Sequence, residues 1–402
     1  MNKYKIAFVT GVPNWHFPEF YKKLTSNPRI DLTMLFCEAF SEDFNRQLFG
    51  ISDMQYGVDF LEGYKYKFLR NYSPLKPKYA KVSFFRHLNF GVWKEITGRH
   101  YDAVIIDIWN GISYWLAAAA SKVSGTPLLL TNDSSILKEM DKAKWKREVK
   151  KFFLTKFLFP LASGFLYRTE VNFQLFRFYG VPERLLFFYP LSVDFEGLYR
   201  KYSNLKEEKF DLRLKYKIPK DAFLILFVGR LAKEKRPQDL LEAYLRLSIP
   251  NKALIFVGDG ELKNLLQENV KQKDIKNVYF MGFRPKTEIP NFYAMADLLV
   301  LPSEIESHGD VVKEAMCFAL PVIVSDKVGS SLDVVKHGKN GYTYKCGDID
   351  MLSFYIVELL DEGKRENFGR MALEEAKNWD HNVAINGLLY ALDCVVKNKK
   401  ER

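Results

Sequence analysis

Short apolar runs rich in Val, Ile, Leu and Phe alternate with amphipathic stretches of helical length along the chain. This alternation is typical of parallel sheets that are buried between two layers of helices. In the first half the expected strands are residues 5–11, 31–37, 66–69, 103–108, 127–131 and 164–167. In the second half they are residues 224–229, 253–258, 278–282, 298–302, 321–325 and 341–344. The pattern predicts an α/β protein with two doubly wound, Rossmann-like sheets.

A polar, charge-rich stretch separates the two sets of strands, so we expect a linker near residues 195–220. The length of 402 residues allows two domains, each with its own core. We predict an N-terminal domain over residues 1–200, a C-terminal domain over residues 201–380, and a final helix at about 380–402 that packs back on the first domain. Because ligands of open α/β sheets bind beyond the carboxyl ends of the strands, two domains facing each other would enclose the site in a cleft.

The composition excludes several classes of protein. With 48% hydrophobic and 27% charged residues, the chain is neither disordered nor fibrous. Its four cysteines lie far apart without a C-x-x-C pair, which argues against a disulfide scaffold or a zinc site. The N-terminus lacks the pattern of a secretory signal, and polar residues or a proline interrupt the apolar segments 103–120 and 152–166. We therefore expect a cytoplasmic protein without membrane spans.

The net charge of +11 is concentrated in the first half of the chain. Residues 1–200 contain 28 Lys and Arg against 19 Asp and Glu, whereas residues 201–402 contain 32 against 30. Six cations within ten positions precede a run of aromatic residues: Lys142, Lys144, Lys146, Arg147, Lys150 and Lys151. We expect the aromatic residues to fill the core, and the cations either to contact an anionic membrane or to form an ordinary solvated face.

The segment 302–326 places two carboxylates around the start of a helix. Glu306 lies on the loop after an expected strand, and Gly309 allows the turn into a helix that begins near Asp310 and carries Glu314. Carboxylates are good acceptors for the hydroxyl groups of sugars and ribose. The ordinary alternative is a loop carboxylate at Glu306 and a favourable charge near a helix N-terminus at Glu314.

The segment FVGRLAKEKRPQDLLEAY, residues 227–244, has the same strand–loop–helix layout with Arg230 and Lys235 on the loop. An arginine can hold a phosphate in bidentate fashion, and a lysine adds a point charge. The pair could therefore bind a diphosphate and stabilise the negative charge that develops as it leaves. The alternative is a solvated charged turn.

The second half resembles the family 4 glycosyltransferases of the GT-B fold, the glycosyl transferases group 1 type. The motifs that carry the resemblance are GR-x4-K, VGDGEL, FMGF, FYAMADLLVLPS, E-x7-E, PVIVSD and NGYTY, in the family's order. The first half resembles the family more loosely, through the opening strand with Gly11 and the segments 60–69, 101–107 and 125–133. The resemblance implies two domains that face each other across a cleft, the first binding the acceptor and the second the donor.

The resemblance also implies a role for individual residues. Arg230 and Lys235 would bind the donor diphosphate, and Glu306 would contact the transferred sugar. Glu314 would bind the ribose hydroxyls. The other implied donor-binding positions are Gly11, Gly229, Phe283, Arg284, His308, Gly309, Asp310, Val311 and Val312. The family reaction retains the anomeric configuration without a bound metal or other cofactor, and the cationic pair can replace a metal at the diphosphate.

Two positions depart from the family pattern. Many members have an aromatic residue where this chain has His308, so its imidazole either reaches the sugar or has no role. Many also carry a histidine after the fifth strand, where this chain reads Thr-Asn-Asp-Ser. Asp133 is our candidate for the acceptor contact and for catalysis, with a helix N-cap as the ordinary alternative.

The combined expectation is a cytoplasmic, retaining glycosyltransferase of cell-surface polysaccharide synthesis, peripheral at the inner membrane face. It would move a sugar from a nucleotide-diphosphate sugar to a glycan or a lipid-linked acceptor. One alternative is another enzyme of the same fold, such as a nucleotide-sugar epimerase, which the E-x7-E spacing disfavours. A second alternative is a non-catalytic protein on this fold that binds a polyanion or a nucleotide. The sequence has neither a helix-turn-helix nor a zinc pattern, so we expect no nucleic-acid partner.

Overall fold

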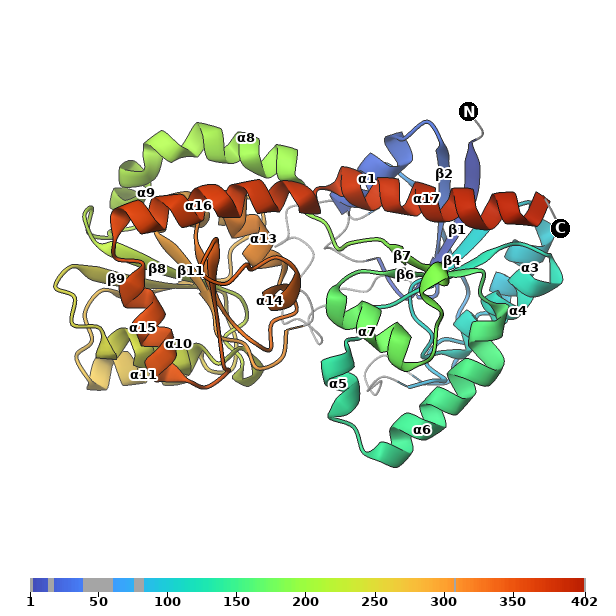
Figure 1. Cartoon of the computed structure of the whole chain (residues 1–402), viewed down its shortest axis with the longest axis horizontal. Coiled ribbons are helices and arrows are strands. Elements are labelled where there is room, and N and C mark those ends of the chain that lie inside the picture. The colour runs from blue at the N-terminus through green and yellow to red at the C-terminus, as the bar shows by residue number, and fades with distance from the viewer. Residues whose placement is uncertain (1–2, 14–17, 39–60, 76–82, 307–308, 401–402) are drawn as a thin grey trace. The chain divides into compact units, whose positions relative to one another are not determined.

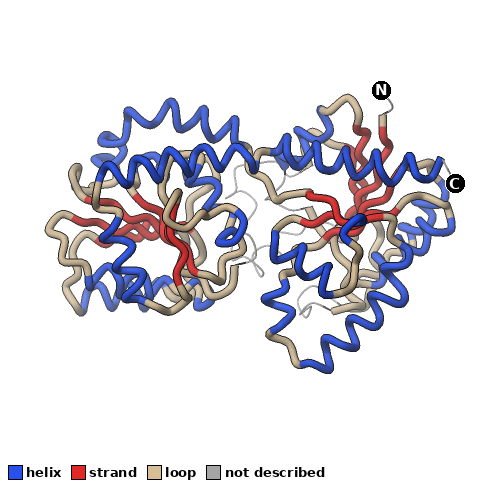
Figure 2. Tube along the Cα trace, in the orientation of Figure 1, coloured by secondary structure: helices blue, strands red, loops and turns tan. Residues whose placement is uncertain are grey.

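The computed structural model describes residues 3–13, 18–38, 61–75, 83–306 and 309–400. The chain forms two compact units, residues Met1–Pro190 with His381–Arg402, and residues Leu191–Asp380. Each unit is built on a parallel sheet with helices on both faces, as Figure 2 shows in red and blue. The predicted α/β class with two doubly wound sheets is therefore confirmed.

The first unit contains a seven-stranded sheet in the order β3-β2-β1-β4-β5-β6-β7, and every pairing is parallel. Its strands are β1 (Tyr4–Thr10), β2 (Ile30–Phe36), β3 (Lys65–Phe68), β4 (Ala103–Ile106), β5 (Leu128–Thr131), β6 (Gly164–Tyr167) and β7 (Leu186–Phe188). Six of them overlap the expected strands. The strand β7 has only three residues, too few for a recognisable apolar pattern.

Alternate side chains of β1 enter two different cores, because successive residues of a strand point to opposite faces. Ala7 and Val9 join one apolar core, and Ile6 and Phe8 join the other. The helices of this unit are α1 (Pro18–Ser26), α3 (Gly91–Gly98), α4 (Ile112–Val123), α5 (Ile136–Met140), α6 (Lys144–Phe153), α7 (Glu170–Phe178) and α17 (His381–Lys400).

The last helix, α17, belongs to the first unit although it follows the whole second unit in sequence. It packs beside α1 and against β6 and β7 (Figure 1). Its side chains Ala384, Leu388 and Leu392 are fully buried in the core that Ile6 and Phe8 also enter. An ion pair of 2.7 Å between Arg29 Nη2 and Asp393 Oδ1 adds a polar contact between this helix and the start of β2.

The second unit contains a six-stranded parallel sheet in the order β10-β9-β8-β11-β12-β13. Its strands are β8 (Phe223–Val228), β9 (Lys252–Val257), β10 (Val278–Gly282), β11 (Leu298–Leu301), β12 (Val322–Ser325) and β13 (Gly341–Tyr344), and they match the six expected strands. Its helices are α8 (Phe195–Leu205), α9 (Lys209–Lys215), α10 (Pro237–Arg246), α11 (Lys263–Gln272), α12 (Ile289–Met295), α13 (Asp310–Met316), α14 (Ser330–Asp333), α15 (Ile349–Glu358) and α16 (Glu362–Ala376). Within the described ranges, no helix combines the length and the apolar character needed to cross a membrane.

The stretch expected to be a linker, residues 195–220, is instead largely helical. It contains α8 and α9, whose apolar side chains pack against the core of the second unit. The charged sequence is misleading here because only a few apolar residues of each helix make this contact: α9 buries Leu212, and α8 packs through partly buried side chains. The chain passes from one unit to the other after Pro190 and returns after Asp380.

The burial of α17 leads to a prediction about stability. Leu388→Ala should lower the unfolding free energy of the first unit by about 2–5 kcal/mol, because it leaves a cavity in the core. Urea unfolding followed by tryptophan fluorescence measures the change. Tyr390→Ala on the same helix is the control, since this side chain is 65% exposed and should cost below about 1 kcal/mol. Equal losses in both variants would contradict the packing of α17.

Candidate active site

The loops that follow β8, β9 and β10 are held together at the carboxyl edge of the second sheet. The amide of Gly229 donates to the carbonyl of Val257 at 3.0 Å, and the amide of Gly258 donates to the carbonyl of Gly282 at 2.9 Å. Gly258 has a φ of +138°, and a Cβ atom there would lie 1.9 Å from the carbonyl oxygen of Gly229. Only glycine allows this approach, which fixes the loop that carries the predicted cations.

The two predicted cations each pair with a carboxylate. Arg230 pairs with Glu234 on the same loop, and Lys235 pairs with Glu306 on the loop after β11. The amide of Glu304 donates to the carbonyl of Glu234 at 2.9 Å and ties the two loops together. The structure therefore brings together Lys235 and Glu306, two residues that the sequence places in separate motifs.

The helix α13 begins where the sequence predicts. Gly309 precedes it with a φ of +69°, and Asp310 forms a 2.9 Å ion pair with Lys313. Val312 is buried and Val311 is partly exposed. Farther along α13, Glu314 accepts a hydrogen bond of 2.8 Å from the hydroxyl of Tyr293. Burial raises the pKa of Glu314 above its usual value.

The remaining predicted donor residues follow β10 and precede α13. Phe283 comes directly after the last residue of β10 and is partly exposed. Arg284 Nε donates to the carbonyl of Met281 at 3.0 Å, and its Nη1 pairs with Glu288 at 3.3 Å. His308 lies outside the described residues.

A second polar cluster lies at the carboxyl edge of the first sheet and includes the predicted residue Asp133. The buried Arg168 pairs with Asp133 at 2.5 Å, and its other terminal nitrogen pairs with Asp107. Thr131 accepts from Arg168 Nε at 3.2 Å, and the Thr10 hydroxyl donates to Asp107 at 3.3 Å. These residues follow or end four different strands, so the parallel topology gathers them at one edge.

Asp107 and Arg168 are residues that our sequence reasoning missed. Each is the first residue after an apolar strand, which is the position where charged groups of α/β proteins reach a ligand. Burial raises the pKa of Asp107 to about 6, against the lowering effect of the Arg168 guanidinium. Both carboxylates raise the pKa of Arg168 further above its usual value.

Gly11 lies in the first unit, directly after β1. A Cβ atom at this position would lie 3.3 Å from the Tyr114 hydroxyl and 3.4 Å from His87 Cε1. Gly11 therefore allows these two side chains to pack against the chain at the end of β1.

The basic helix α6 differs from our expectation in two respects. Lys142 and Lys150 both pair with Glu139, at 2.9 and 2.7 Å, so the two lysines neutralise a buried carboxylate. Of the aromatic residues that follow the cations, Phe159 is buried in the core as expected, whereas Phe152, Phe153 and Phe157 are about half exposed. The prediction of a core role fails for Phe152 and Phe153 because α6 packs so loosely that none of its residues is buried.

Comparison with known proteins links the second unit to one family. Residues 208–375 match the model of the family described as glycosyl transferases group 1. An uncharacterized glycosyltransferase of Methanocaldococcus jannaschii is 33% identical over 184 residues, which cover 44% of this chain and 47% of that protein. The alpha-monoglucosyldiacylglycerol synthase of Acholeplasma laidlawii is 34% identical over 156 residues, 38% of each chain. These matches span less than half the length of either relative.

Similarity of structure extends over both units. The crystal structure of HepE from Anabaena in complex with UDP has a TM-score of 0.73 and 19% identity, covering 97% of this chain and 100% of that one. The chain thus has the GT-B fold. The match to the glycosyl transferases group 1 family covers residues 208–375, which lie within the second unit.

The raised pKa of Asp107 leads to a prediction for stability against pH. An aspartate of the unfolded chain titrates near pH 3.9, so between about pH 4 and 6 the folded protein keeps a proton that the unfolded chain has lost. As the pH rises from 4 to 7, the free energy of unfolding of the wild type should therefore fall by up to about 3 kcal/mol relative to that of Asp107→Asn. Chemical unfolding at several pH values measures this difference. Asp350→Asn, at a side chain that is 91% exposed, is the control, and a pH-independent difference for Asp107→Asn would contradict the prediction.

Proposed function

We propose that this protein is a retaining glycosyltransferase, which moves a sugar from a nucleotide-diphosphate sugar to a glycan or a lipid-linked acceptor. The observation that carries the proposal is the contact of Lys235 with Glu306, beside Arg230, in the unit that matches the glycosyl transferases group 1 family. The contact joins a group suited to the diphosphate to a group suited to the sugar. The proposal extends the family match of one unit to an activity of the whole chain.

The charges of this site suit a diphosphate. Glu234 and Glu306 each neutralise one cation, Arg230 and Lys235 respectively. A diphosphate carries more negative charge than a single carboxylate and offers several oxygens, so it would compete for both cations. Glu306 would then accept hydrogen bonds from the sugar hydroxyls, and Glu314 from the ribose hydroxyls.

The reaction that we propose exchanges one bond at the anomeric carbon of the donor sugar for another. The acceptor oxygen forms a bond to the anomeric carbon, and the bond from that carbon to the diphosphate oxygen breaks. The acceptor proton passes to the leaving diphosphate, whose charge Arg230 and Lys235 stabilise. The carboxylates Asp107 and Asp133 of the first unit would accept hydrogen bonds from acceptor hydroxyls.

Calorimetry with UDP, GDP and ADP tests the donor site. The wild type should bind at least one of them, and Arg230→Ala or Lys235→Ala should weaken binding about tenfold or more. Lys233→Ala removes a cation of the same loop for which we propose no ligand contact, so it should leave the affinity within about twofold. Binding should also persist in EDTA, because the protein's own cations hold the diphosphate. A wild type that binds none of the three would favour the polyanion-binding alternative.

We further propose that the acceptor is carried by a membrane, which α6 contacts. Trp145 is 66% exposed, and Phe152, Phe153 and Phe157 form an exposed group of rings with centroids 5.7–6.1 Å apart. Exposed lysines lie on the same segment: Lys144, Lys146 and Lys156. Aromatic side chains beside cations suit the interface of an anionic bilayer. The notable relative here is the Acholeplasma laidlawii enzyme, whose name identifies a diacylglycerol product.

Sedimentation with vesicles containing phosphatidylglycerol tests this contact. The wild type should bind them at low salt and release them at high salt, because cations near an anionic surface contribute about 1 kcal/mol each. The triple variant with Lys144, Lys146 and Lys156 changed to Gln should bind much less. Lys142→Gln is the control, because this lysine pairs with Glu139. Equal binding of the triple variant and the wild type would contradict the proposal.

A further inference from the structure

The loop of residues 83–90 lies across the carboxyl ends of two strands of the first sheet. Asn89 Nδ2 donates to the carbonyls of Cys37 and Leu69, at 2.7 and 2.9 Å. These two residues directly follow β2 and β3. The loop therefore occupies the edge at which open α/β sheets bind their ligands.

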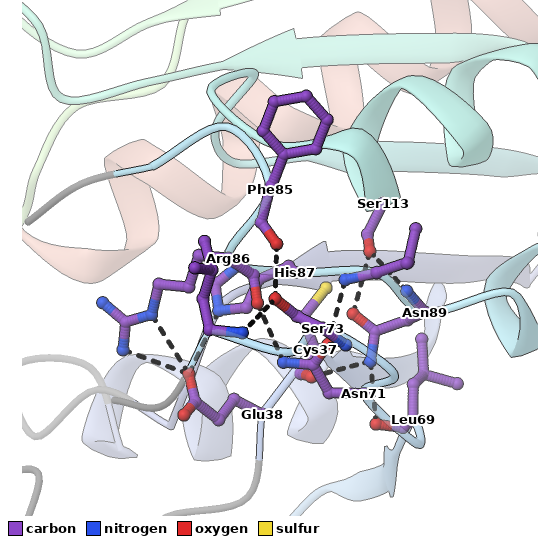
Figure 3. A network of polar contacts seen from close by, with 12 residues as sticks. Cys37, Glu38, Leu69, Asn71, Ser73, Phe85, Arg86, His87, Asn89 and Ser113 are labelled. Atoms are coloured by element: carbon purple, nitrogen blue, oxygen red, sulfur yellow. Dashed lines mark hydrogen bonds and ion pairs between the residues drawn. The ribbon is translucent and has the colours of Figure 1, made fainter. Parts of the chain in front are cut away.

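Charged side chains anchor the centre of this loop (Figure 3). Arg86 Nη2 pairs with Glu38 at 3.0 Å, and His87 Nε2 lies 3.2 Å from the same carboxylate. On its other side, His87 Nδ1 lies 3.2 Å from the hydroxyl of Tyr114. Against the raising effect of burial, the contacts with His87 and Arg86 lower the pKa of Glu38 below its usual value.

The backbone of the loop is held as firmly as its side chains. Asn71 donates to the carbonyl of Arg86 at 3.0 Å and accepts from the amide of Leu88 at 3.0 Å. Ser73 donates to the carbonyl of Phe85 at 2.6 Å. The amide of Ile112 donates to the carbonyl of Phe84 at 3.1 Å. Such a dense set of hydrogen bonds leaves this loop little freedom to rearrange.

This rigid loop nevertheless exposes aromatic rings. Phe85 is 61% exposed and Phe84 is 43% exposed, with their ring centroids 5.7 Å apart. In Figure 3 the ring of Phe85 points away from the hydrogen-bonded network. Trp115 supports Phe84 from α4, at a centroid distance of 6.1 Å. Large apolar rings held in water by a fixed backbone are a feature of preorganised binding surfaces.

We propose that Phe84 and Phe85 form an aromatic platform for a glycan, in which a sugar ring stacks on the face of one ring and the other ring, at 87° to the first, flanks the sugar. One face of a hexose ring carries mainly C–H bonds and packs on an aromatic ring, while its hydroxyls point outward to polar partners. Arg86 and Glu38 pair with each other on the side from which the Phe85 ring points away, so they hold the loop, and the rings make the contact with the sugar. The identification of this glycan as the acceptor rests on the proposed function.

Charge distinguishes this platform from the surface of α6. The loop of residues 83–90 contains one arginine and one histidine, and both contact Glu38. Residues 83–90 themselves contain no lysine of the kind that suits an anionic membrane, although Lys76, Lys78 and Lys81 precede them in the sequence outside the described residues. A neutral ligand that combines apolar faces with hydroxyl groups fits it better than a lipid surface.

A glycan array tests the platform without knowledge of the acceptor. The probes are immobilised mono- to tetrasaccharides of hexoses and N-acetylhexosamines, and the full-length protein is labelled and clustered to increase its avidity. The wild type should bind at least one group of glycans, and Phe85→Ala or Phe84→Ala should reduce that signal on the order of tenfold. Phe354→Ala removes a ring that is 55% exposed on α15 and should leave the signal unchanged.

A second variant tests whether the platform must be rigid. Asn71→Ala keeps both rings but removes two backbone contacts of the loop, so it should weaken glycan binding while circular dichroism stays unchanged. Binding of no glycan by the wild type, or equal binding by Phe85→Ala, would overturn the proposal. The proposal would also be overturned, in favour of a lipid surface, if Phe85→Ala lost binding to anionic vesicles but kept its binding to glycans. If calorimetry detects no binding of UDP, GDP or ADP, only the proposed function is overturned, because the glycan array reports on the first unit.

Discussion

All strand pairings in both sheets are parallel, and this constraint decides where chemistry can occur in each unit. A parallel sheet sends every strand's carboxyl end to the same edge, so loops from distant parts of the sequence meet there. Asp107, Asp133 and Arg168 follow three different strands of the first sheet, yet they form one ion-paired cluster. Lys235 and Glu306 meet in the same way at the edge of the second sheet.

Each edge keeps its charged groups close to neutrality. In the second unit, two cations face two carboxylates, and Gly258 allows the close backbone contact that holds the cationic loop in place. In the first unit, the buried guanidinium of Arg168 forms ion pairs with two carboxylates, so the cluster carries one net negative charge when both carboxylates are ionised. Burial, with a smaller contribution from the charge of Asp133, raises the pKa of Asp107 to about 6 despite its ion pair.

The first unit has two surfaces that differ in rigidity and charge. The helix α6 has no buried residue and combines half-exposed rings with lysines. The loop of residues 83–90 exposes rings as well, but hydrogen bonds from Asn71, Ser73 and Asn89 hold its backbone. A loosely packed basic helix suits a fluid, anionic surface, whereas a fixed and nearly neutral platform suits a ligand of defined shape.

The sequence by itself determined the α/β class, twelve of the thirteen strands found in the described residues, and the positions of Arg230, Lys235, Glu306 and Glu314 on loops or helix starts. These features depend on local apolar patterns and on short motifs, which a single chain segment carries. The tertiary structure alone decided which charged residues pair: Arg168 with Asp107, and Lys142 with Glu139. It also decided that Phe152 and Phe85 face solvent, because whether an aromatic residue is buried depends on which distant elements pack against it.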